Sequence, residues 1–389
     1  MAVFIIATFC TLLLIAYLFD LTSSRTKIPS AILLLLLGWL IKQSTLFFNL
    51  HVPDFSSFLP VLGTIGLILI VLEGSLELEL NKSKIGLIKK SFIGALVPLI
   101  ALAFLFAFLF RYFGQFGFRD SLINAIPFCV ISSAIAIPSV INLTASDREF
   151  VIYESSLSDI LGVLLFNFIA LNETFDFHSF GHFVLQLLII IVVSFIASIG
   201  LSIFLKKIEH HVKFVPIMLI VILIYAVSKI HHLPGLIFIL LFGLFIGNLD
   251  GLIHFKWIKK LKPEELNKEV RKFKELTIEG AFLVRALFFL LFGFLIETSE
   301  LLNAETFLWA LAIVFFIFFI RAIQLKLSKI PFQPLLFIAP RGLITILLFL
   351  SIESSHNISL VNKSLIIQVI VLTALLMMVV LIATKSKKE

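Results

Sequence analysis

The stretch IPSAILLLLLGWLI at residues 28–41 has a counterpart in LPGLIFILLFGLFI at residues 233–246. In each, a proline precedes a glycine by nine residues: Pro29 and Gly38 in the first, Pro234 and Gly243 in the second. Both runs are almost wholly apolar, which is typical of a helix that lies in lipid. The pattern therefore indicates that the chain repeats itself within a membrane.

The composition supports this interpretation. Of 389 residues, 60% are apolar and only 14% are charged, whereas soluble domains contain about half apolar and a quarter charged residues. This excludes a soluble globule and predicts an all-α polytopic membrane protein. The net charge of +7 allows a nucleic-acid partner in principle, but we attribute it to cytoplasmic loops and expect no nucleic acid.

Apolar runs of about 17 to 25 residues predict thirteen transmembrane helices. Their expected limits are 2–20, 28–42, 57–75, 85–110, 121–144, 149–172, 179–205, 213–230, 234–249, 278–297, 304–325, 333–353 and 363–384. The loops on one side would carry 23 of the 31 Lys and Arg residues. Because basic loops stay in the cytoplasm, we expect the N-terminus outside and the C-terminus in the cytoplasm of a plasma (inner) membrane.

Two further correspondences extend the repeat. The pattern LxGxL closes the third span at Leu72–Leu76 and the tenth at Leu291–Leu295. The spans at 121–144 and 333–353 are each interrupted by a proline, Pro138 and Pro340. Paired copies lie seven spans apart, so they cross the membrane in opposite directions. Inverted repeats with two discontinuous crossing helices are typical of secondary transporters, although both prolines are also compatible with simple kinks.

The predicted organisation follows from the repeat. Residues 1–178 form the first repeat, with core helices in spans 4–6, and residues 213–389 form the second, with core helices in spans 11–13. Residues 179–212 hold a linking span. Residues 250–277 form a charged cytoplasmic linker, interpreted either as an amphipathic surface helix or as a solvated connection.

Charges inside a membrane are costly and mark candidate functional sites. The run ESSLSD at residues 154–159 places Ser155, Ser158 and Asp159 on one helix face. Their oxygens suit a partly dehydrated monovalent cation, and burial of a carboxylate lets protons compete with that cation. One carboxylate that binds either a proton or a cation suffices for exchange. The alternative is that Asp159 is a structural partner of Arg341 or Arg285.

Other buried charges are expected to support this site. Glu154 and Arg285 are predicted to form a structural pair. Arg341, directly after Pro340, is expected to offset carbonyl dipoles freed by the break. For Arg321 we expect only that its side chain extends toward the cytoplasm.

These residues resemble those of a known family. The run ESSLSD is similar to the Glu-Ser-x-x-Asn-Asp motif of the sodium/proton exchanger branch of the monovalent cation/proton antiporter superfamily. Four other stretches resemble family segments in the same order, as in the NhaP- and Kef-type transmembrane domains: VLEGSLELE at 71–79, LPGLIFILLFGLFIGN at 233–248, RALFFLLFGFLIE at 285–297 and PRGLITILL at 340–348.

The resemblance implies a homodimer of thirteen-helix subunits with elevator-like alternating access. It makes Asp159 the ion- and proton-binding carboxylate, Ser155 a ligand, and Glu154 with Arg285 a stabilising pair. It sets Arg341 beside the crossing helices and Glu73 near the ion path. In this chain Ser158 stands at the family's Asn position, and the Thr-Asp-Pro of the first crossing helix is Ala136, Ile137 and Pro138. Because Ser158 is neutral, one carboxylate remains, which favours electroneutral exchange.

The function predicted is antiport of Na⁺, or of Li⁺ or K⁺, against H⁺, with no cofactor, no resident metal and no enzymatic activity. One alternative is a potassium efflux channel of the same fold, which the apparent lack of a soluble regulatory domain argues against. An intramembrane aspartyl protease would need a second aspartate within a span, and Asp159 is the only one in the interior of a predicted span.

Overall fold

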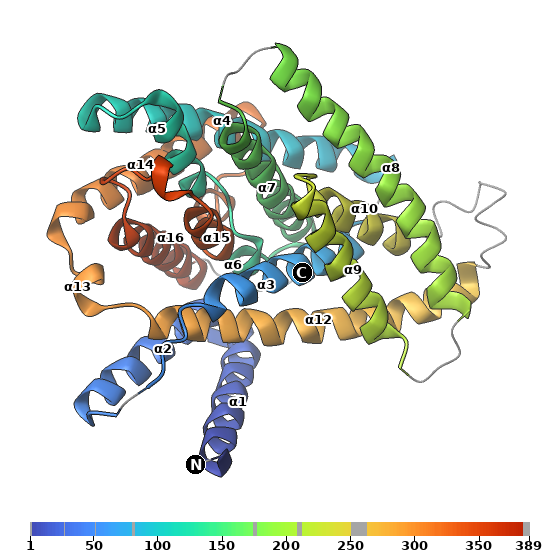
Figure 1. Ribbon diagram of the computed structural model, residues 1–389, viewed down its shortest axis with the longest axis horizontal. Helices are drawn as coiled ribbons and strands as arrows, with labels where there is room; N and C mark the ends of the chain where they lie inside the picture. The colour runs from blue at the N-terminus through green and yellow to red at the C-terminus, as the bar shows by residue number, and fades with distance from the viewer. Residues whose placement is uncertain are drawn as a thin grey trace. The chain divides into compact units, whose positions relative to one another are not determined.

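The computed structural model describes residues 2–26, 28–50, 52–79, 82–173, 177–207, 212–249 and 263–383. Within these ranges every regular element is a helix (Figure 1). Ten of the described segments are long and apolar enough to cross a membrane, and two shorter apolar helices add to them. The predicted all-α polytopic class is confirmed, whereas the count of thirteen crossings stays a prediction.

The chain divides into two compact units, each built from separate stretches of sequence. The first comprises Met1–Thr64, Lys90–Gly162 and Leu283–Glu389, and the second comprises Ile65–Lys89 and Val163–Phe282. The first unit therefore contains most of the core spans predicted for both repeats. The repeats themselves, as a division of the sequence, remain a prediction.

The first unit is a bundle of long helices around short broken ones. In it α14 packs against α16, and α15 packs against the short helix η2 (Figure 1). Its elements are α1 (Ala2–Thr26), α2 (Ser30–Phe47), α4 (Ile85–Gly114), α5 (Phe118–Ala125), η2 (Ile126–Phe128), α6 (Ser133–Ser139), α7 (Ala145–Leu171), α13 (Thr298–Leu301), α14 (Ala304–Leu327), η4 (Leu335–Phe337), α15 (Leu343–Leu350), η5 (Ser354–His356) and α16 (Lys363–Ala383).

Two glycines of the repeat pattern meet in this unit. A Cβ atom on Gly38 of α2 would collide with the backbone oxygen of Leu290, and one on Gly293 would collide with the backbone oxygen of Leu35. Both collisions are with backbone, which cannot move aside. The helices therefore approach this closely only because neither position carries a side chain.

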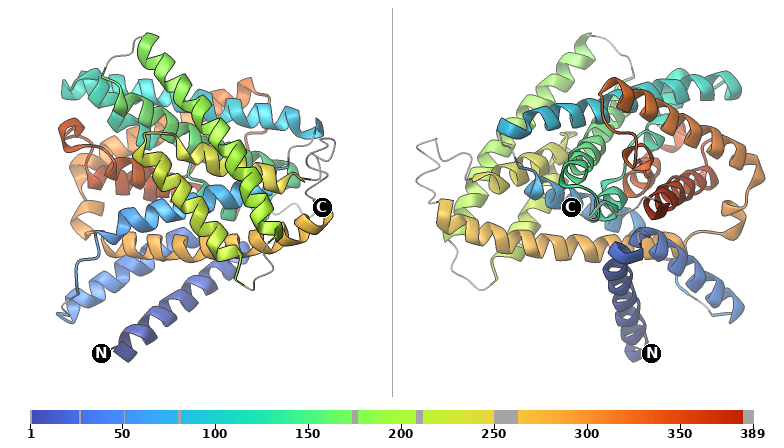
Figure 2. Two further views of the ribbon diagram at one scale, coloured as in Figure 1. Left: turned by 45° about the vertical axis from the view of Figure 1, so that its right-hand side comes forward. Right: turned by 180° about the vertical axis from the view of Figure 1, so that it is seen from behind.

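The second unit holds α8 (Phe177–Lys207), α9 (Phe214–Ile230) and α10 (Gly235–Gly247), with most of α3 (Phe58–Glu77), the short helix η1 (Lys82–Lys84) and the start of α12 (Pro263–Phe294). Helices α8 and α10 lie side by side in both views of Figure 2. Buried Ser194, Ser198 and Ser202 recur every fourth residue on α8. Such small side chains allow close packing of membrane helices.

The second pair of repeat glycines packs in a matching way. A Cβ atom on Gly243 of α10 would collide with the Ser75 side chain of α3, and one on Gly247 would lie 3.0 Å from the backbone oxygen of Leu76. The first copy of the proline–glycine run thus packs on the second LxGxL stretch, and the second copy packs on the first. This exchange of partners is what an inverted repeat predicts.

The charged linker differs from the expectation of a separate surface helix. Residues 250–262 lie outside the described ranges, and residues 263–277 belong to α12, which continues into the next apolar run. Two ion pairs fix this part of α12 within its unit, Lys213 with Glu269 at 2.5 Å and Lys274 with Glu77 at 3.5 Å. Its charges are therefore part of the helix packing as well as of the surface.

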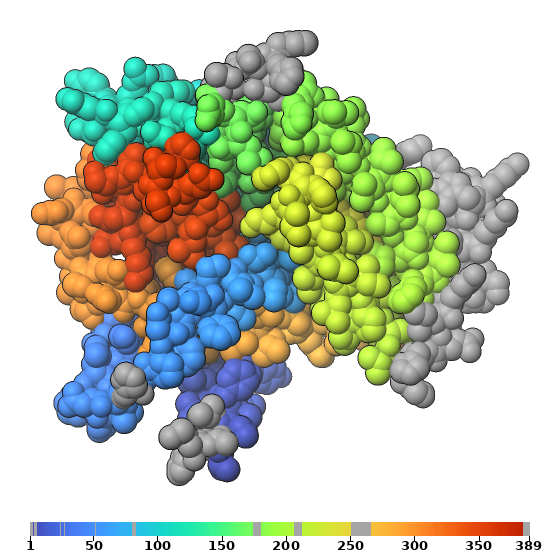
Figure 3. Space-filling view, viewed as in Figure 1, coloured from blue at the N-terminus to red at the C-terminus, as the bar shows by residue number. Residues whose placement is uncertain are grey.

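The outer faces are apolar, as lipid requires. Large apolar side chains are exposed along α1, and α8 and α9 lie side by side on the face shown in Figure 3. Examples on α8 and α9 are Leu188, Val192, Phe195, Ile196, Leu219 and Leu223. The core of the first unit, in contrast, contains buried serines and arginines, and these positions form the candidate site.

Candidate functional site

The first broken segment runs through α5, η2 and α6. Helical structure stops after Phe128 and resumes at Ser133, so residues 129–132 form a short unwound stretch that is almost completely buried. The break predicted at Pro138 was therefore misplaced, because Pro138 lies inside α6 near its end. Proline has no backbone amide to donate, but α6 has only seven residues and therefore few helical hydrogen bonds for Pro138 to interrupt.

The second broken segment has its proline where it was expected. Residues 338–342, with Pro340 in the middle, separate η4 from α15. The two unwound stretches meet directly, since the amide of Ser132 donates to the carbonyl of Pro340 at 2.9 Å. A Cβ atom on Gly342 would lie 2.7 Å from Ile135 Cδ1 and 2.9 Å from Ser132 Oγ. Both atoms end side chains, so a methyl group at position 342 would displace these two side chains at the crossing.

Arg341 is buried at this crossing, with 1% of its surface exposed. Its Nε donates to the Phe128 carbonyl at 2.6 Å, Nη1 donates to Ala339 at 2.8 Å, and Nη2 lies 3.5 Å from the Cys129 carbonyl. The Phe128 and Cys129 carbonyls lie where the helical part of the first broken segment ends, the Ala339 carbonyl lies in the unwound part of the second, and all three carry partial negative charge. The guanidinium thus satisfies backbone acceptors that unwinding leaves free.

Asp159 of α7 faces the start of α6. Ser133 Oγ donates a very short hydrogen bond to Asp159 Oδ2, and the Ser133 amide approaches the same oxygen at 3.4 Å. The other carboxylate oxygen, Oδ1, is buried and has no hydrogen-bond partner among the described residues. One oxygen of the carboxylate is thus held by the protein while the other is available.

The serines around Asp159 differ from one another in their hydrogen bonds. Ser158 Oγ accepts from the Ile131 amide at 2.9 Å, and Ser155 Oγ donates to the Val151 carbonyl at 2.7 Å. Ser156 Oγ is buried without a partner in the described part of the chain. Ser158 therefore attaches α7 to the unwound stretch, Ser155 retains free lone pairs, and Ser156 has its whole hydroxyl available.

Glu154 pairs with a different arginine from the one expected. Arg321 of α14 donates to both of its carboxylate oxygens, at 3.0 and 2.7 Å, and both side chains are at most 2% exposed. The assignment of Arg285 to this pair was therefore wrong, and so was the solvent-directed orientation expected for Arg321. Arg321 Nε also donates to the Leu335 carbonyl at 2.8 Å, so the arginine links α7 to the second broken segment.

A small pocket adjoins these groups inside the first unit. Its lining includes Ser158, Arg321, Arg341, Cys129 and Pro98, with apolar side chains from α4 and α14. Space beside two buried arginines and the motif serine allows water to reach the charged groups.

The remaining predicted charges lie elsewhere. Arg285 is on α12 in the first unit and is 9% exposed. Glu73 is half-buried on α3 in the second unit. The structure brings together Asp159, Ser155, Ser158, Glu154, Arg341 and Pro340, and it adds Ser133, Ser156 and Arg321.

Two broken helices that cross beside a buried, half-satisfied carboxylate define a secondary transporter by class. The sequence matches the family Sodium/hydrogen exchanger, transmembrane, over residues 10–384. The chain belongs to this family, and the predicted membership of the cation/proton antiporters is confirmed. No individual curated protein matches the sequence.

The fold is similar to that of solved antiporters. A structure of the sodium proton antiporter MjNhaP1 from Methanocaldococcus jannaschii at pH 8 has a TM-score of 0.70 and 19% identity, with 100% of both chains covered. A structure from an electron-microscopy map of MjNhaP1 has a TM-score of 0.70 and 18% identity, and covers 98% of this chain and 96% of the other. At these identities the likeness shows the fold, and family membership supports cation/proton antiport.

Proposed function

We propose that this protein exchanges one monovalent cation, Na⁺ before Li⁺ or K⁺, for one proton by alternating access. The observation that carries the proposal is the unpartnered Oδ1 of buried Asp159, whose Oδ2 is held by Ser133. A buried carboxylate oxygen without a donor calls for a proton, a water molecule or a cation. Exchange follows if proton and cation take turns at this one atom.

The surrounding charges explain why exchange is electroneutral in this proposal. Glu154 and Arg321 neutralise one another, and Arg341 is fully engaged with backbone carbonyls. Asp159 with a bound proton and Asp159⁻ with a bound monovalent cation carry the same net charge. The loaded site therefore carries the same charge in both directions, and membrane potential has no net work to do on the cycle.

The neighbouring residues have supporting roles in this mechanism. Ser155 offers lone pairs as a ligand, and Ser158 holds α7 to the unwound stretch. Glu73 is assigned as a charge near the ion path. These assignments rest on the position of each residue in its helix and on its burial.

The membrane arrangement belongs to the same proposal. We place the protein in the plasma (inner) membrane as a homodimer, with its N-terminus outside and its C-terminus in the cytoplasm. The excess of Lys and Arg in the loops after odd-numbered spans supports this orientation.

The decisive experiment measures cation-induced proton movement in inverted vesicles that contain the native chain or Asp159→Asn. We expect exchange with Na⁺ or another alkali cation in the native chain and none in the variant. Asp54→Asn, in an exposed loop, is the matched control. Exchange that persists without the Asp159 carboxylate would refute the mechanism, and cation flux without coupled proton movement would indicate the channel alternative.

A further inference from the structure

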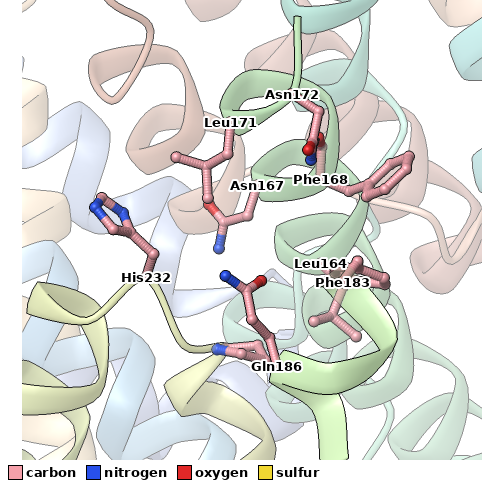
Figure 4. A pocket seen from close by; sticks show the side chains of 9 residues that line it. Leu164, Asn167, Phe168, Leu171, Asn172, Phe183, Gln186 and His232 are labelled. Carbon is pink, nitrogen blue, oxygen red and sulfur yellow. The ribbon is translucent and has the colours of Figure 1, made fainter. Parts of the chain in front are cut away.

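A second polar pocket lies within the second unit, and its lining contains none of the residues assigned above. It is formed by the last turns of α7, by α8 and by the loop between α9 and α10 (Figure 4). Its polar lining consists of Asn167, Asn172, Gln186 and His232, and the rings of Phe168 and Phe183 pack edge to face beside them at 5.0 Å. It is partly open to the surface, and its enclosed part has room for about one water-sized group.

The amide groups in this pocket have spare bonding capacity. The side chains of Asn167 and Gln186 point toward one another across the pocket (Figure 4), and neither has a hydrogen-bond partner within the described residues. Asn172 Nδ2 donates to the Phe168 carbonyl at 2.8 Å, which leaves the amide oxygen of Asn172 available. The pocket thus offers several neutral oxygens and has no acidic or basic side chain other than His232 in its lining.

Helix α7 carries these oxygens on the same face as the candidate ion site. At 3.6 residues per turn, Ser156, Asp159, Val163 and Asn167 fall within an arc of about 80° on this one helix. Ser156 Oγ and Asp159 Oδ1 are both buried without partners in the described part of the chain, and Asn167 lies about two turns further along the same face, beyond Val163, in the lining of the pocket. Polar oxygens spaced along one helix face are the kind of groups that a moving cation uses in place of its water.

We propose that this pocket, called here the amide pocket, binds a partly hydrated alkali cation before that cation moves on to Asp159. This proposal rests on the proposed exchange function and adds a waiting site on one side of the membrane. Amide oxygens replace some of the water around the ion without adding charge, so the ion binds weakly and leaves quickly. The last carbonyls of α7, which ends at Leu171, add partial negative charge and favour a cation over an anion.

The size of the pocket fits this ligand. Its enclosed part has room for about one water-sized group, which matches a single alkali cation, and the remaining waters of the ion stay on the open side of the pocket. Such a waiting site contributes to the affinity for the cation only at the face of the membrane from which the cation reaches the pocket.

The test uses the full-length protein in proteoliposomes of uniform orientation, with cation dependence measured separately from each face. We expect Asn167→Leu and Gln186→Leu each to raise the cation KM at one face by about three- to tenfold and to leave kcat within about twofold. Asn167→Asp adds a negative charge and lowers the same KM. His182→Ala, exposed on α8 one turn before Gln186 and outside the lining, is the matched control and leaves both faces unchanged.

A binding measurement separates this proposal from the exchange function. ²³Na relaxation on Asp159→Asn, which lacks the transport carboxylate, should show weak Na⁺ binding that Asn167→Leu in the same chain removes. Unchanged KM at both faces in an active protein, or an equal rise at both, would overturn the amide pocket and leave the exchange proposal standing. A native chain inactive with every alkali cation, but with Asn167-dependent Na⁺ binding, would reject the exchange function instead.

Discussion

Asp159 depends on a single hydroxyl for its orientation. Ser133 at the start of α6 donates to its Oδ2, whereas Ser139 at the end of the same helix donates only to the Ile135 carbonyl. We expect Ser133→Ala to raise the cation KM by about tenfold, because a hydrogen bond to a charged group contributes about 1.5–3 kcal/mol. Ser133→Thr, which keeps the hydroxyl, should restore the native value.

Ser139→Ala is the control for this prediction, since it removes a hydroxyl from α6 without touching Asp159. Cation-dependent proton movement in proteoliposomes gives both values. Equal effects of Ser133→Ala and Ser139→Ala would mean that the hydroxyls act only through the stability of α6.

The stability of the first unit also depends on single residues, the buried ion pair of Glu154 and Arg321. Removing either partner leaves an uncompensated charge among buried side chains, which costs about 3–5 kcal/mol. We expect Arg321→Met and Glu154→Leu each to lower the melting temperature in detergent strongly. The double variant should be more stable than either single variant, because no buried charge remains.

Thermal unfolding followed by tryptophan fluorescence provides this comparison. Arg111→Gln, at the exposed end of α4, serves as the control. Additive losses in the double variant would show that the two side chains act independently.

Single residues also show where sequence reasoning reached its limit. The sequence predicted that Asp159 is buried and that Glu154 pairs with an arginine, because both acids lie within an apolar span where an isolated charge is costly. It could not identify Arg321 or Ser133, which lie on other helices. The signal for Arg321 was its isolation in a long apolar run, but its closeness to Lys326 made an interfacial position equally reasonable.

At the scale of elements, the crossing of the two unwound stretches depends on Gly342. An added Cβ would lie 2.7 Å from Ile135 and 2.9 Å from Ser132, beside the amide that bonds to Pro340. We expect Gly342→Ala to reduce exchange at least about tenfold, because the strain of overpacking, about 1–3 kcal/mol, falls on the crossing itself. Membrane insertion should be unaffected.

Gly200→Ala on α8 is the matched control, because an added Cβ there meets nothing within 4 Å. It should leave exchange unchanged, and it should slightly favour the helix. The measurement is the exchange rate of the two variants and the native chain at equal protein content. Native activity in Gly342→Ala would show that the crossing tolerates displacement.

The two broken segments show why one break was located and the other misplaced. In the second segment the break coincides with Pro340, which lies between the short helices η4 and α15, so the proline marked the break correctly. In the first segment the interruption precedes α6, and it is stabilised by hydrogen bonds with Pro340, Asp159 and Arg341, which all lie outside the local sequence. Such long-range hydrogen bonds leave no local signal, so Pro138 drew the prediction to the wrong position.

At the scale of the whole molecule, the paired proline–glycine and LxGxL stretches were visible in sequence because their glycines serve one purpose in both places. Gly38 packs on the second LxGxL stretch and Gly243 packs on the first. The division of the chain into two compact units could not be predicted from the sequence in the same way. Each combines stretches from both repeats, and α4, α7 and α12 each pass from one unit into the other.

The coupling of proton and cation is also a property of the whole transporter. If Asp159 is the single carrier, proton and cation compete for one carboxylate, and the cation KM rises as pH falls. On the acidic side of this titration the rise approaches about tenfold per pH unit, since one proton is displaced for each cation bound. A limiting slope of two would require a second carboxylate and would contradict the role given to neutral Ser158.

The response of exchange to an imposed membrane potential independently measures how many charges move in each cycle. One proton for one monovalent cation moves no net charge, so a potassium diffusion potential imposed with valinomycin should change neither the rate nor the end point of Na⁺/H⁺ exchange. An exchange of two protons for one cation would be driven by about 2.3 kcal/mol for each 100 mV. Asp159 would then need a partner carboxylate, and Ser158→Asp, which puts a second carboxylate beside the first, tests this directly. We expect that variant to become sensitive to the potential while the native chain is not, because the number of carboxylates at the crossing sets the charge that the cycle moves.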